Sequence, residues 1–122
     1  MRIPVTTLND GYDFPLLGLG TYKLGPEDVE VVLRRAIELG YRHIDTAALY
    51  GNEEAVGKAI GDAIAAGDVT REDLFVTTKL WNDDQDRPAA AYQDSLKRLN
   101  LEFIDLYLVH WPWPQRGLYV SA

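Results

Sequence analysis

Three amphipathic helix patterns alternate with short apolar segments, and this alternation restricts the fold more than any other feature of the chain. The helix patterns begin at Pro26, Asn52 and Pro88 and end at Gly40, Gly67 and Asn100. The apolar segments are Leu16–Gly20, Tyr41–Asp45, Leu74–Lys79 and Phe103–Val109. Strands that are separated by helices form parallel sheets with right-handed crossovers. We therefore predict an α/β fold with four parallel strands and about three helices.

Each helix pattern carries one apolar stripe that is expected to face the sheet. The stripes are Val29, Val32, Leu33, Ala36 and Ile37; then Val56, Ala59, Ile60, Ala63 and Ile64; then Ala89, Tyr92, Leu96 and Leu99. Residues at these intervals share one face because an α-helix has 3.6 residues per turn. Asn52 is interpreted as the N-cap of the second helix, and Thr70–Asp73 as a tight turn with a capping box.

A small hairpin is expected ahead of the helices. Ile3–Leu8 and Tyr12–Phe14 favour strands, and Asn9-Asp10-Gly11 between them is a strong turn signal, because Asp and Gly tolerate positive φ. A two-stranded hairpin is marginal alone and must lie on something else. No linker or low-complexity segment divides the chain. We predict one domain over residues 1–122, with the hairpin at 3–14 and βα units at 16–110.

Charge and composition narrow the range of partners. The chain has 12 basic and 19 acidic residues, a net charge of −7, which argues against nucleic acid or an anionic membrane as the main partner. It has no cysteine, so neither disulfide nor thiolate chemistry is expected. No apolar run approaches the ~20 residues of a membrane helix, and no signal peptide is recognisable. We expect a cytoplasmic location.

Chemically versatile side chains end three consecutive predicted strands. Asp45, Lys79 and His110 hold these positions, and Tyr50 lies on the loop that follows Asp45. The carboxyl ends of parallel strands lie at one edge of a sheet. We therefore expect these four side chains to converge, although they are far apart in the sequence.

This group of side chains suits the reduction of a carbonyl group. A free phenol is a weak acid, with a pKa of about 10, and a neighbouring ammonium makes it a stronger one. In this hypothesis Tyr50 is the general acid, Lys79 and Asp45 tune it, and His110 donates a hydrogen bond to the substrate oxygen. Taken singly, each residue also has an ordinary explanation as a turn former, a surface charge or a core residue. The hypothesis therefore depends on all four meeting.

Two other patterns are weak candidates for sites. His43 and Asp45 share one face of a strand, but no third ligand has suitable spacing, so we predict no metal site. Gly18-Leu19-Gly20-Thr21 lacks the third glycine and the immediate helix of a dinucleotide fingerprint. We interpret this segment as a tight strand-to-loop turn.

The same residues resemble those of the aldo-keto reductases. The matching segments are Leu17–Thr21, Gly40–Ala47, Tyr50–Glu53, Thr78–Trp81 and Asp105–Pro112. They occur in the family's order and extend over essentially the whole chain. The amino-acid sequences of these segments are most similar to those of microbial members of the 2,5-diketogluconate reductase type.

The resemblance implies a role for each residue of the site. It implies that Asp45, Tyr50, Lys79 and His110 are the catalytic tetrad, with Tyr50 as proton donor. It implies NADPH as cofactor, with Gly20, Thr21, Tyr22 and Asp45 near the nicotinamide. It implies a small carbonyl substrate, an aldehyde or ketone reduced to an alcohol. The substrate pocket would be lined by Tyr22, Tyr50, Trp81, His110 and Trp111. Trp81 and Trp111 could also serve only for core or loop packing, and for Trp111 we favour the pocket.

Length is the departure from the family. The family fold is a (β/α)₈ TIM barrel, which typically has about 250 residues, whereas this chain has 122. The resemblance therefore implies the N-terminal half of a barrel, truncated after strand four. Its two outer strands and inner face would be uncovered, which favours self-association or pairing with a missing C-terminal half.

Two alternatives to a working reductase remain open from the sequence. The chain could be a truncated half-barrel that keeps the tetrad but is catalytically incompetent alone, an assembly fragment that needs the missing half. It could also resemble the regulatory members of the family, such as the potassium-channel β subunits. The intact tetrad favours descent from an enzyme over the regulatory alternative.

Overall fold

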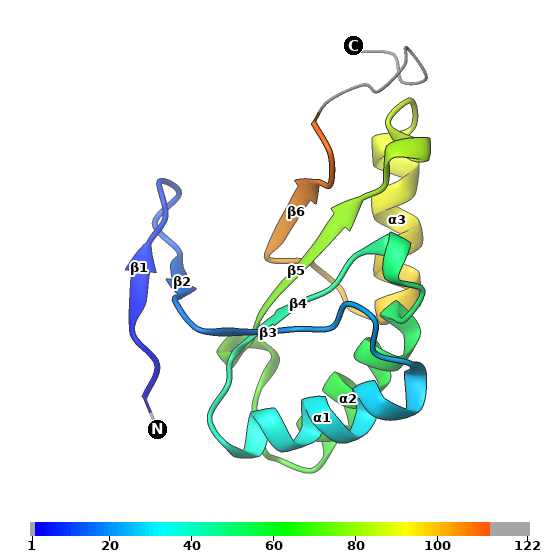
Figure 1. Cartoon of the computed structure of the whole chain (residues 1–122). Helices are drawn as coiled ribbons and strands as arrows, with labels where there is room; N and C mark the ends of the chain where they lie inside the picture. Colours follow the sequence, from blue (N-terminus) through cyan, green and yellow to red (C-terminus); the bar gives the residue numbers. More distant parts are fainter. Residues whose placement is uncertain (1, 113–122) are drawn as a thin grey trace.

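The computed structural model describes residues 2–112, which form a hairpin followed by a parallel sheet with helices on one side (Figure 1). The hairpin pairs β1 (Val5–Thr7) with β2 (Asp13–Pro15) in antiparallel register. Gly11 in its turn has a φ of 88°, which glycine adopts without steric cost. The structure thus contains the hairpin that the sequence predicts. Residues 113–122 of the predicted domain lie outside the described residues.

Four parallel strands form the sheet that positions the site. They are β3 (Gly18–Gly20), β4 (His43–Asp45), β5 (Phe75–Leu80) and β6 (Leu106–Val109), and they are hydrogen-bonded in this order. Sequence order and spatial order coincide, as is usual when each crossover leads to the next strand. The predicted α/β fold with four parallel strands is therefore confirmed.

Three helices connect the strands and cover one face of the sheet (Figure 1). They are α1 (Pro26–Glu38), α2 (Glu53–Ala65) and α3 (Pro88–Leu99). Short 3₁₀ turns η1 (Ala48–Tyr50), η2 (Arg71–Asp73) and η3 (Asn82–Asp84) lie between the larger elements. The predicted capping box at Thr70 is present: its hydroxyl accepts from the Asp73 amide, and its own amide donates to the Asp73 carboxylate.

Several details of the helix prediction were wrong. Val32 of the first stripe is 37% exposed, and Ala89 at the start of α3 is exposed. The buried residues of α3 are Ala91, Ser95 and Leu99, so its contact stripe is shifted from the predicted one. Asn52 does precede α2, but its side chain makes no capping hydrogen bond. Its amide has other partners, which are described below.

The first and last predicted strands were too long. Leu16 and Leu17 are exposed and precede β3, which contains only Gly18–Gly20. Phe103 is also exposed and precedes β6. Both strands are edges of the sheet that the structure describes. An apolar residue beside an edge strand has a neighbour on one side only, which explains why these residues are less buried than the pattern suggested.

The core lies between the sheet and the helices. Ile44 and Val76 extend from the sheet into a cluster of buried side chains that includes Leu33, Ile60 and Leu99. Gly57 lets α2 approach the end of α3 closely, because a Cβ at this position would lie 2.1 Å from the Leu99 carbonyl oxygen. Alternate strand residues face opposite sides of a sheet. The neighbours of Ile44 and Val76 therefore extend from the other face, which we call the open face.

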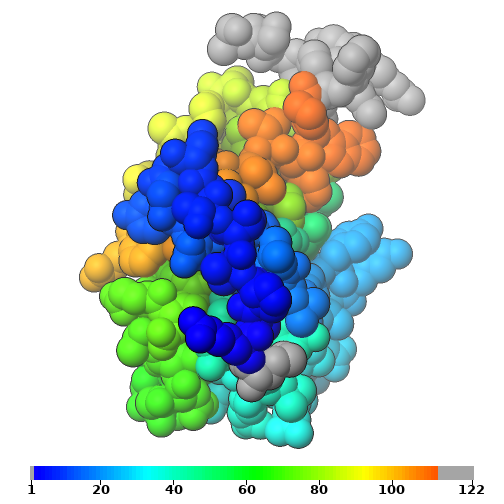
Figure 2. All heavy atoms as spheres, turned by 90° about the vertical axis from the view of Figure 1, so that its left-hand side faces the viewer, coloured from blue at the N-terminus to red at the C-terminus, as the bar shows by residue number. Residues whose placement is uncertain are grey.

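The hairpin covers the amino-terminal end of the open face. The Phe14 ring of β2 packs edge-to-face on His43 and Phe75, with ring centroids 4.8 and 5.0 Å apart. Seen from the hairpin side, Figure 2 shows β1 and β2 in blue lying across the middle of the molecule. The carboxyl-terminal ends of β4 and β5 lie beyond the hairpin, and it is there that the predicted site residues meet.

Candidate active site

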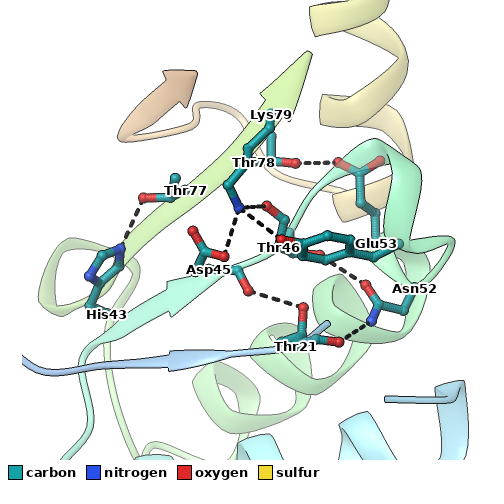
Figure 3. Close-up of polar contacts among 10 residues, drawn as sticks. Thr21, His43, Asp45, Thr46, Asn52, Glu53, Thr77, Thr78 and Lys79 are labelled. Carbon is teal, nitrogen blue, oxygen red and sulfur yellow. Dashed lines mark hydrogen bonds and ion pairs between the residues drawn. The ribbon is translucent and has the colours of Figure 1, made fainter. Parts of the chain in front are cut away.

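Asp45 and Lys79 form an ion pair on the open face. Strand pairing places Asp45 beside Thr77, and Lys79 follows two residues later on the same face of β5. The Lys79 Nζ lies 2.7 Å from Asp45 Oδ2 (Figure 3). The side chains are 14% and 33% exposed, so the pair is partly desolvated and is screened less than a surface ion pair.

The Lys79 ammonium has three hydrogen-bond acceptors. Besides Asp45, it donates to the Thr46 carbonyl oxygen at 2.9 Å and to the Tyr50 hydroxyl at 3.3 Å. An ammonium has three N–H groups and no acceptor, so this set uses all of them. Lys79 is therefore fixed in position, with one N–H directed at the phenol.

Tyr50 reaches the ammonium because of the turn that carries it. The 3₁₀ turn η1 ends at Tyr50, and Gly51 follows at a φ of 68°, a conformation that favours glycine. The Lys79 Nζ also lies 5.0 Å from the centroid of the Tyr50 ring. Lys79 thus contacts two of the other three predicted residues, Asp45 and Tyr50, directly.

His110 is the fourth predicted residue and lies directly after β6. Its backbone amide donates to the Leu80 carbonyl oxygen at 3.0 Å, which holds it beside β5. Its ring packs edge-to-face on Tyr50, with centroids 5.8 Å apart. Within residues 2–112, its buried Nδ1 atom has no hydrogen-bond partner. This nitrogen is closed to solvent, so it has no surface for a bound molecule.

Burial and the neighbouring ammonium favour a neutral imidazole at His110. Desolvation lowers the pKa of His110 below its ordinary 6.5, and the positive charge of Lys79 lowers it further. The Asp45 carboxylate opposes this shift with a smaller effect. A neutral imidazole has one N–H donor and one acceptor nitrogen. The ring can therefore donate a hydrogen bond without adding a second cation to the site.

Aromatic side chains border this group. Trp81 packs edge-to-face on His110 at 5.3 Å and on Trp111 at 5.8 Å between centroids. The Tyr22 ring lies 5.1 Å from the Tyr50 ring on the other side. Tyr22 and Trp111 are exposed, so both have surface available for another molecule. Tyr22 and His110 thus contact the Tyr50 ring directly, and Trp81 and Trp111 continue the aromatic group from His110.

Gly20 and Thr21 border the site at the end of β3. Gly20 pairs with Asp45, and a Cβ at Gly20 would meet nothing within 4 Å, so the space beside it is open. Thr21 is fully buried, and its amide and hydroxyl both donate to the Asp45 carbonyl oxygen, at 3.1 and 3.0 Å. The polar groups of Thr21 are therefore used within the chain.

Two residues with a structural role in the site were missed from the sequence. Asn52 and Glu53 were interpreted only as an N-cap and a first-turn acid, yet both are 2% exposed. Glu53 accepts from Thr78 at 2.8 Å and from Arg98 at 2.7 Å, which joins β5 beside Lys79 to α3. An acid in a first helical turn usually needs no partner. The sequence therefore carries no signal that distinguishes Glu53 from an exposed one.

No group of three or more His, Cys, Asp or Glu residues within residues 2–112 could hold a metal ion. In the same range, no helix is long and apolar enough to span a bilayer.

The described sheet is parallel, and an Asp-Lys-Tyr contact and a histidine lie at its carboxyl edge. This combination is typical of one class of α/β oxidoreductase. The chain belongs to the aldo/keto reductase family. The family's sequence model matches residues 16–117. The resemblance that was inferred from the five sequence segments is therefore confirmed.

Individual relatives are similar over nearly all of the chain. It is 54% identical to the methylglyoxal reductase DkgA of Escherichia coli K12 over 118 residues, 97% of this chain and 42% of that protein. It is 45% identical to an aldo-keto reductase of Mycobacterium sp. KMS, over 100% of this chain and 44% of that protein. The chain thus spans less than half the length of these relatives.

A solved structure gives the same correspondence. The aldo-keto reductase of Bombyx mori, determined in complex with NADP, is 51% identical, with a TM-score of 0.87. The match covers 92% of this chain and 39% of that one. Since that protein is a (β/α)₈ barrel, the described sheet and helices correspond to part of a barrel. The predicted fold class is confirmed.

Proposed function

We propose that this chain provides the proton-transfer site of an NADPH-dependent reductase that converts aldehydes and ketones to alcohols, with Tyr50 as proton donor. The observation that supports this most directly is the contact chain Tyr50–Lys79–Asp45, with distances of 3.3 and 2.7 Å. It places a cation beside the phenol and a carboxylate behind the cation. An active-site phenol that gives up a proton at neutral pH needs such a partner, because an isolated phenol is a weak acid.

Each residue has one task in the proton transfer. The Tyr50 O–H donates its proton to the carbonyl oxygen as the carbon is reduced. The Lys79 ammonium stabilises the phenolate that remains, and Asp45 holds Lys79 in place. His110 donates a hydrogen bond to the same carbonyl oxygen from its neutral ring, so the substrate is oriented between the imidazole and the phenol.

The residues at the mouth of the site fit a nicotinamide cofactor. The space beside Gly20 is open, the exposed Tyr22 ring offers an aromatic face, and Asp45 lies at the end of the neighbouring strand. Thr21 holds this edge through its two bonds to Asp45. Bound NADPH supplies the hydride for the carbonyl carbon. The Bombyx mori relative, which was solved with NADP, supports this choice of cofactor.

The aromatic border favours a small carbonyl substrate. Tyr22 offers a ring surface beside Tyr50, and Trp81 and Trp111 offer ring surfaces on the side of His110. Binding pockets of this kind suit compact apolar molecules with a polar group. Methylglyoxal is a reasonable test substrate because several relatives are named for it.

The test compares Tyr50→Phe with the unchanged chain. We expect Tyr50→Phe to lower kcat for methylglyoxal by about 10²–10⁴-fold, because it removes the general acid. Binding of NADPH, followed by its fluorescence, should change by less than about twofold because the ring is retained. The matched control is Tyr12→Phe on the exposed hairpin, for which kcat should not change. Equal kcat values for Tyr50→Phe and the unchanged chain would rule out the proposed acid.

The exposed sheet edges support a second candidate function, that of a half-barrel which works only when joined to a complementary half. Strands β3 and β6 are both edges of the described sheet, and Leu108 and Val109 of β6 are exposed. Uncovered edge strands of this kind pair readily with another chain. In this proposal the tetrad is intact, and the partner is either the C-terminal half of a barrel or a second copy of the chain.

Mixing experiments separate the two candidates. The chain is assayed alone and with a polypeptide that comprises the C-terminal part of the E. coli relative, which this chain does not match. Turnover by the chain alone supports the first candidate. Turnover only in the mixture, with a matching rise in sedimenting mass, supports the second. Turnover in neither sample would contradict both.

A further inference from the structure

We propose that Asn52 is a positioning residue that holds the Tyr22 ring against Tyr50. It thereby keeps in place the side of the site where Tyr22 would border the substrate and the cofactor. The inference rests on the proposed function, in which Tyr22 borders both molecules. Asn52 touches no residue of the tetrad through its side chain. It acts through the turn that connects β3 to α1.

The Asn52 amide bonds to two separate loops. Its Nδ2 donates to the carbonyl oxygens of Thr21 and Leu24, at 2.8 and 3.1 Å. Its Oδ1 accepts from the Thr46 hydroxyl at 2.9 Å (Figure 3). Both N–H groups are used, and none of the three bonds is within α2, the helix that Asn52 precedes. Asn52 therefore joins the β3–α1 turn to the loop after β4.

The turn that Asn52 holds carries Tyr22 and contains a left-handed residue. The Leu24 amide donates to the Thr21 carbonyl oxygen at 3.2 Å, which closes the turn around Tyr22 and Lys23. Lys23 has a φ of 62°, a conformation that is unfavourable for a residue with a side chain. Such a conformation persists only where surrounding contacts hold it. The two bonds from Asn52 are contacts of that kind, one at each end of the turn.

The two loops depend on Asn52 to different degrees. Thr46 is held without it, because the Thr46 amide donates to the Thr77 carbonyl oxygen at 2.9 Å. Thr21 is held by Asp45. Leu24 packs against the core and the Tyr22 ring lies on Tyr50, but among the described residues the only hydrogen bond that joins Tyr22–Leu24 to a residue outside the turn comes from Asn52. Loss of the Asn52 amide should therefore allow the Tyr22 ring to move. Lys79 should still donate its hydrogen bond to the Thr46 carbonyl oxygen.

The test uses Asn52→Asp, which keeps the size of the side chain and places an oxygen where Nδ2 donates. Hydrogen exchange of the isolated chain is the first readout. We expect exchange of the Leu24 amide to become at least tenfold faster, with the α2 amides changed by less than twofold. This readout requires no turnover, so it decides the structural claim even where the proposed function fails. Unchanged exchange at Leu24 would overturn the proposal.

Asn82→Asp is the matched control. Asn82 is also 2% exposed, so this variant likewise introduces a carboxyl at a buried position. It should lower the melting temperature without selectively accelerating exchange at Leu24. Equal acceleration at Leu24 in both variants would show that Asn52 has only a general stabilising role and would overturn the proposal.

Kinetics in whichever sample shows turnover provide the second readout. Asn52→Asp should raise the KM for methylglyoxal about tenfold and change kcat by less than threefold, because Tyr50, Lys79 and Asp45 stay in place. In a Tyr22→Ala background, the same substitution should change KM by less than twofold, since the Tyr22 ring through which Asn52 acts has been removed. A full tenfold effect in that background would show that Asn52 does not act through Tyr22.

Discussion

The two histidines of this chain lie at opposite ends of the sheet and have opposite surroundings. His43 begins β4 under the hairpin, between Phe14 and Phe75, and its Nε2 lies 2.9 Å from the Thr77 hydroxyl. His110 follows β6, packs on Tyr50 and Trp81, and has a buried Nδ1 without a partner in the described structure. Burial lowers the pKa of both rings.

The difference shows that burial and a lowered pKa do not identify a functional histidine. Both rings are desolvated, but Nε2 of His43 is paired with the Thr77 hydroxyl, and the ring packs in T-shaped contacts with Phe14 and Phe75. His110 instead has a buried Nδ1 without a partner in the described residues, and its ring packs on a phenol that contacts an ammonium. What distinguishes His110, the ring that we propose acts in the site, is the chemistry of its neighbours.

The largest effect that the comparison predicts is on catalysis at His110. His110→Ala should lower kcat/KM for methylglyoxal about 100-fold, since it removes a hydrogen bond to the oxygen that gains charge. The melting temperature should fall by no more than about 3 °C, because the ring is only partly buried. Initial rates and thermal melting of the same preparation check this. A normal kcat/KM would remove the distinction between the two histidines.

His43→Ala should show the reverse pattern. It creates a cavity between two aromatic rings and leaves the buried Thr77 hydroxyl unpaired, so it should reduce the free energy of unfolding by about 2–3 kcal/mol. Urea unfolding measures the change. In samples that remain folded, kcat should stay within about twofold. A large loss of kcat in folded protein would mean that His43 also acts on the site.

A smaller effect is expected at the two glycines of β3, which lie beside the two ends of the open face. In Gly18→Ala the new Cβ would lie 2.9 Å from His43 Nδ1, so the ring must move, and stability should fall by about 1–2 kcal/mol. Gly20→Ala is the control for stability, because its Cβ would meet nothing within 4 Å. Equal unfolding free energies for the two variants would show that His43 is not tightly packed.

The smallest effect is the pH dependence that His43 contributes. Its folded pKa lies below 6.5, mainly because of burial. As the pH falls below about 6.5, the unfolded chain therefore binds a proton that the folded chain excludes. The contribution of His43 to the free energy of unfolding should be fully present above this pH and should decrease as the pH falls toward the folded pKa. Urea titrations at several pH values, with His43→Gln as reference, should show a steeper decrease for the unchanged chain.

The sequence predicted the order of elements well because the helix periodicity and the apolar strands agree with each other. It also predicted which side chains would meet, since Asp45, Lys79 and His110 follow from the parallel topology. It failed where a contact depends on distant atoms. The bonds of Asn52 to Thr21 and Leu24 span about 30 positions, and no local pattern encodes them. The exposure of Leu16 and Leu17 depended on which strand formed the edge.

The three hydrogen bonds of Lys79 also protect the chain from its proposed substrates. An amine attacks an aldehyde through its nitrogen lone pair and forms an imine, so lysines near a carbonyl compound are at risk of modification. Nζ of Lys79 is held by Asp45, Thr46 and Tyr50, so at least one of these contacts must break before the nitrogen can reach a carbonyl carbon. The contacts that place Lys79 beside a phenol thus also keep its nitrogen away from a carbonyl carbon.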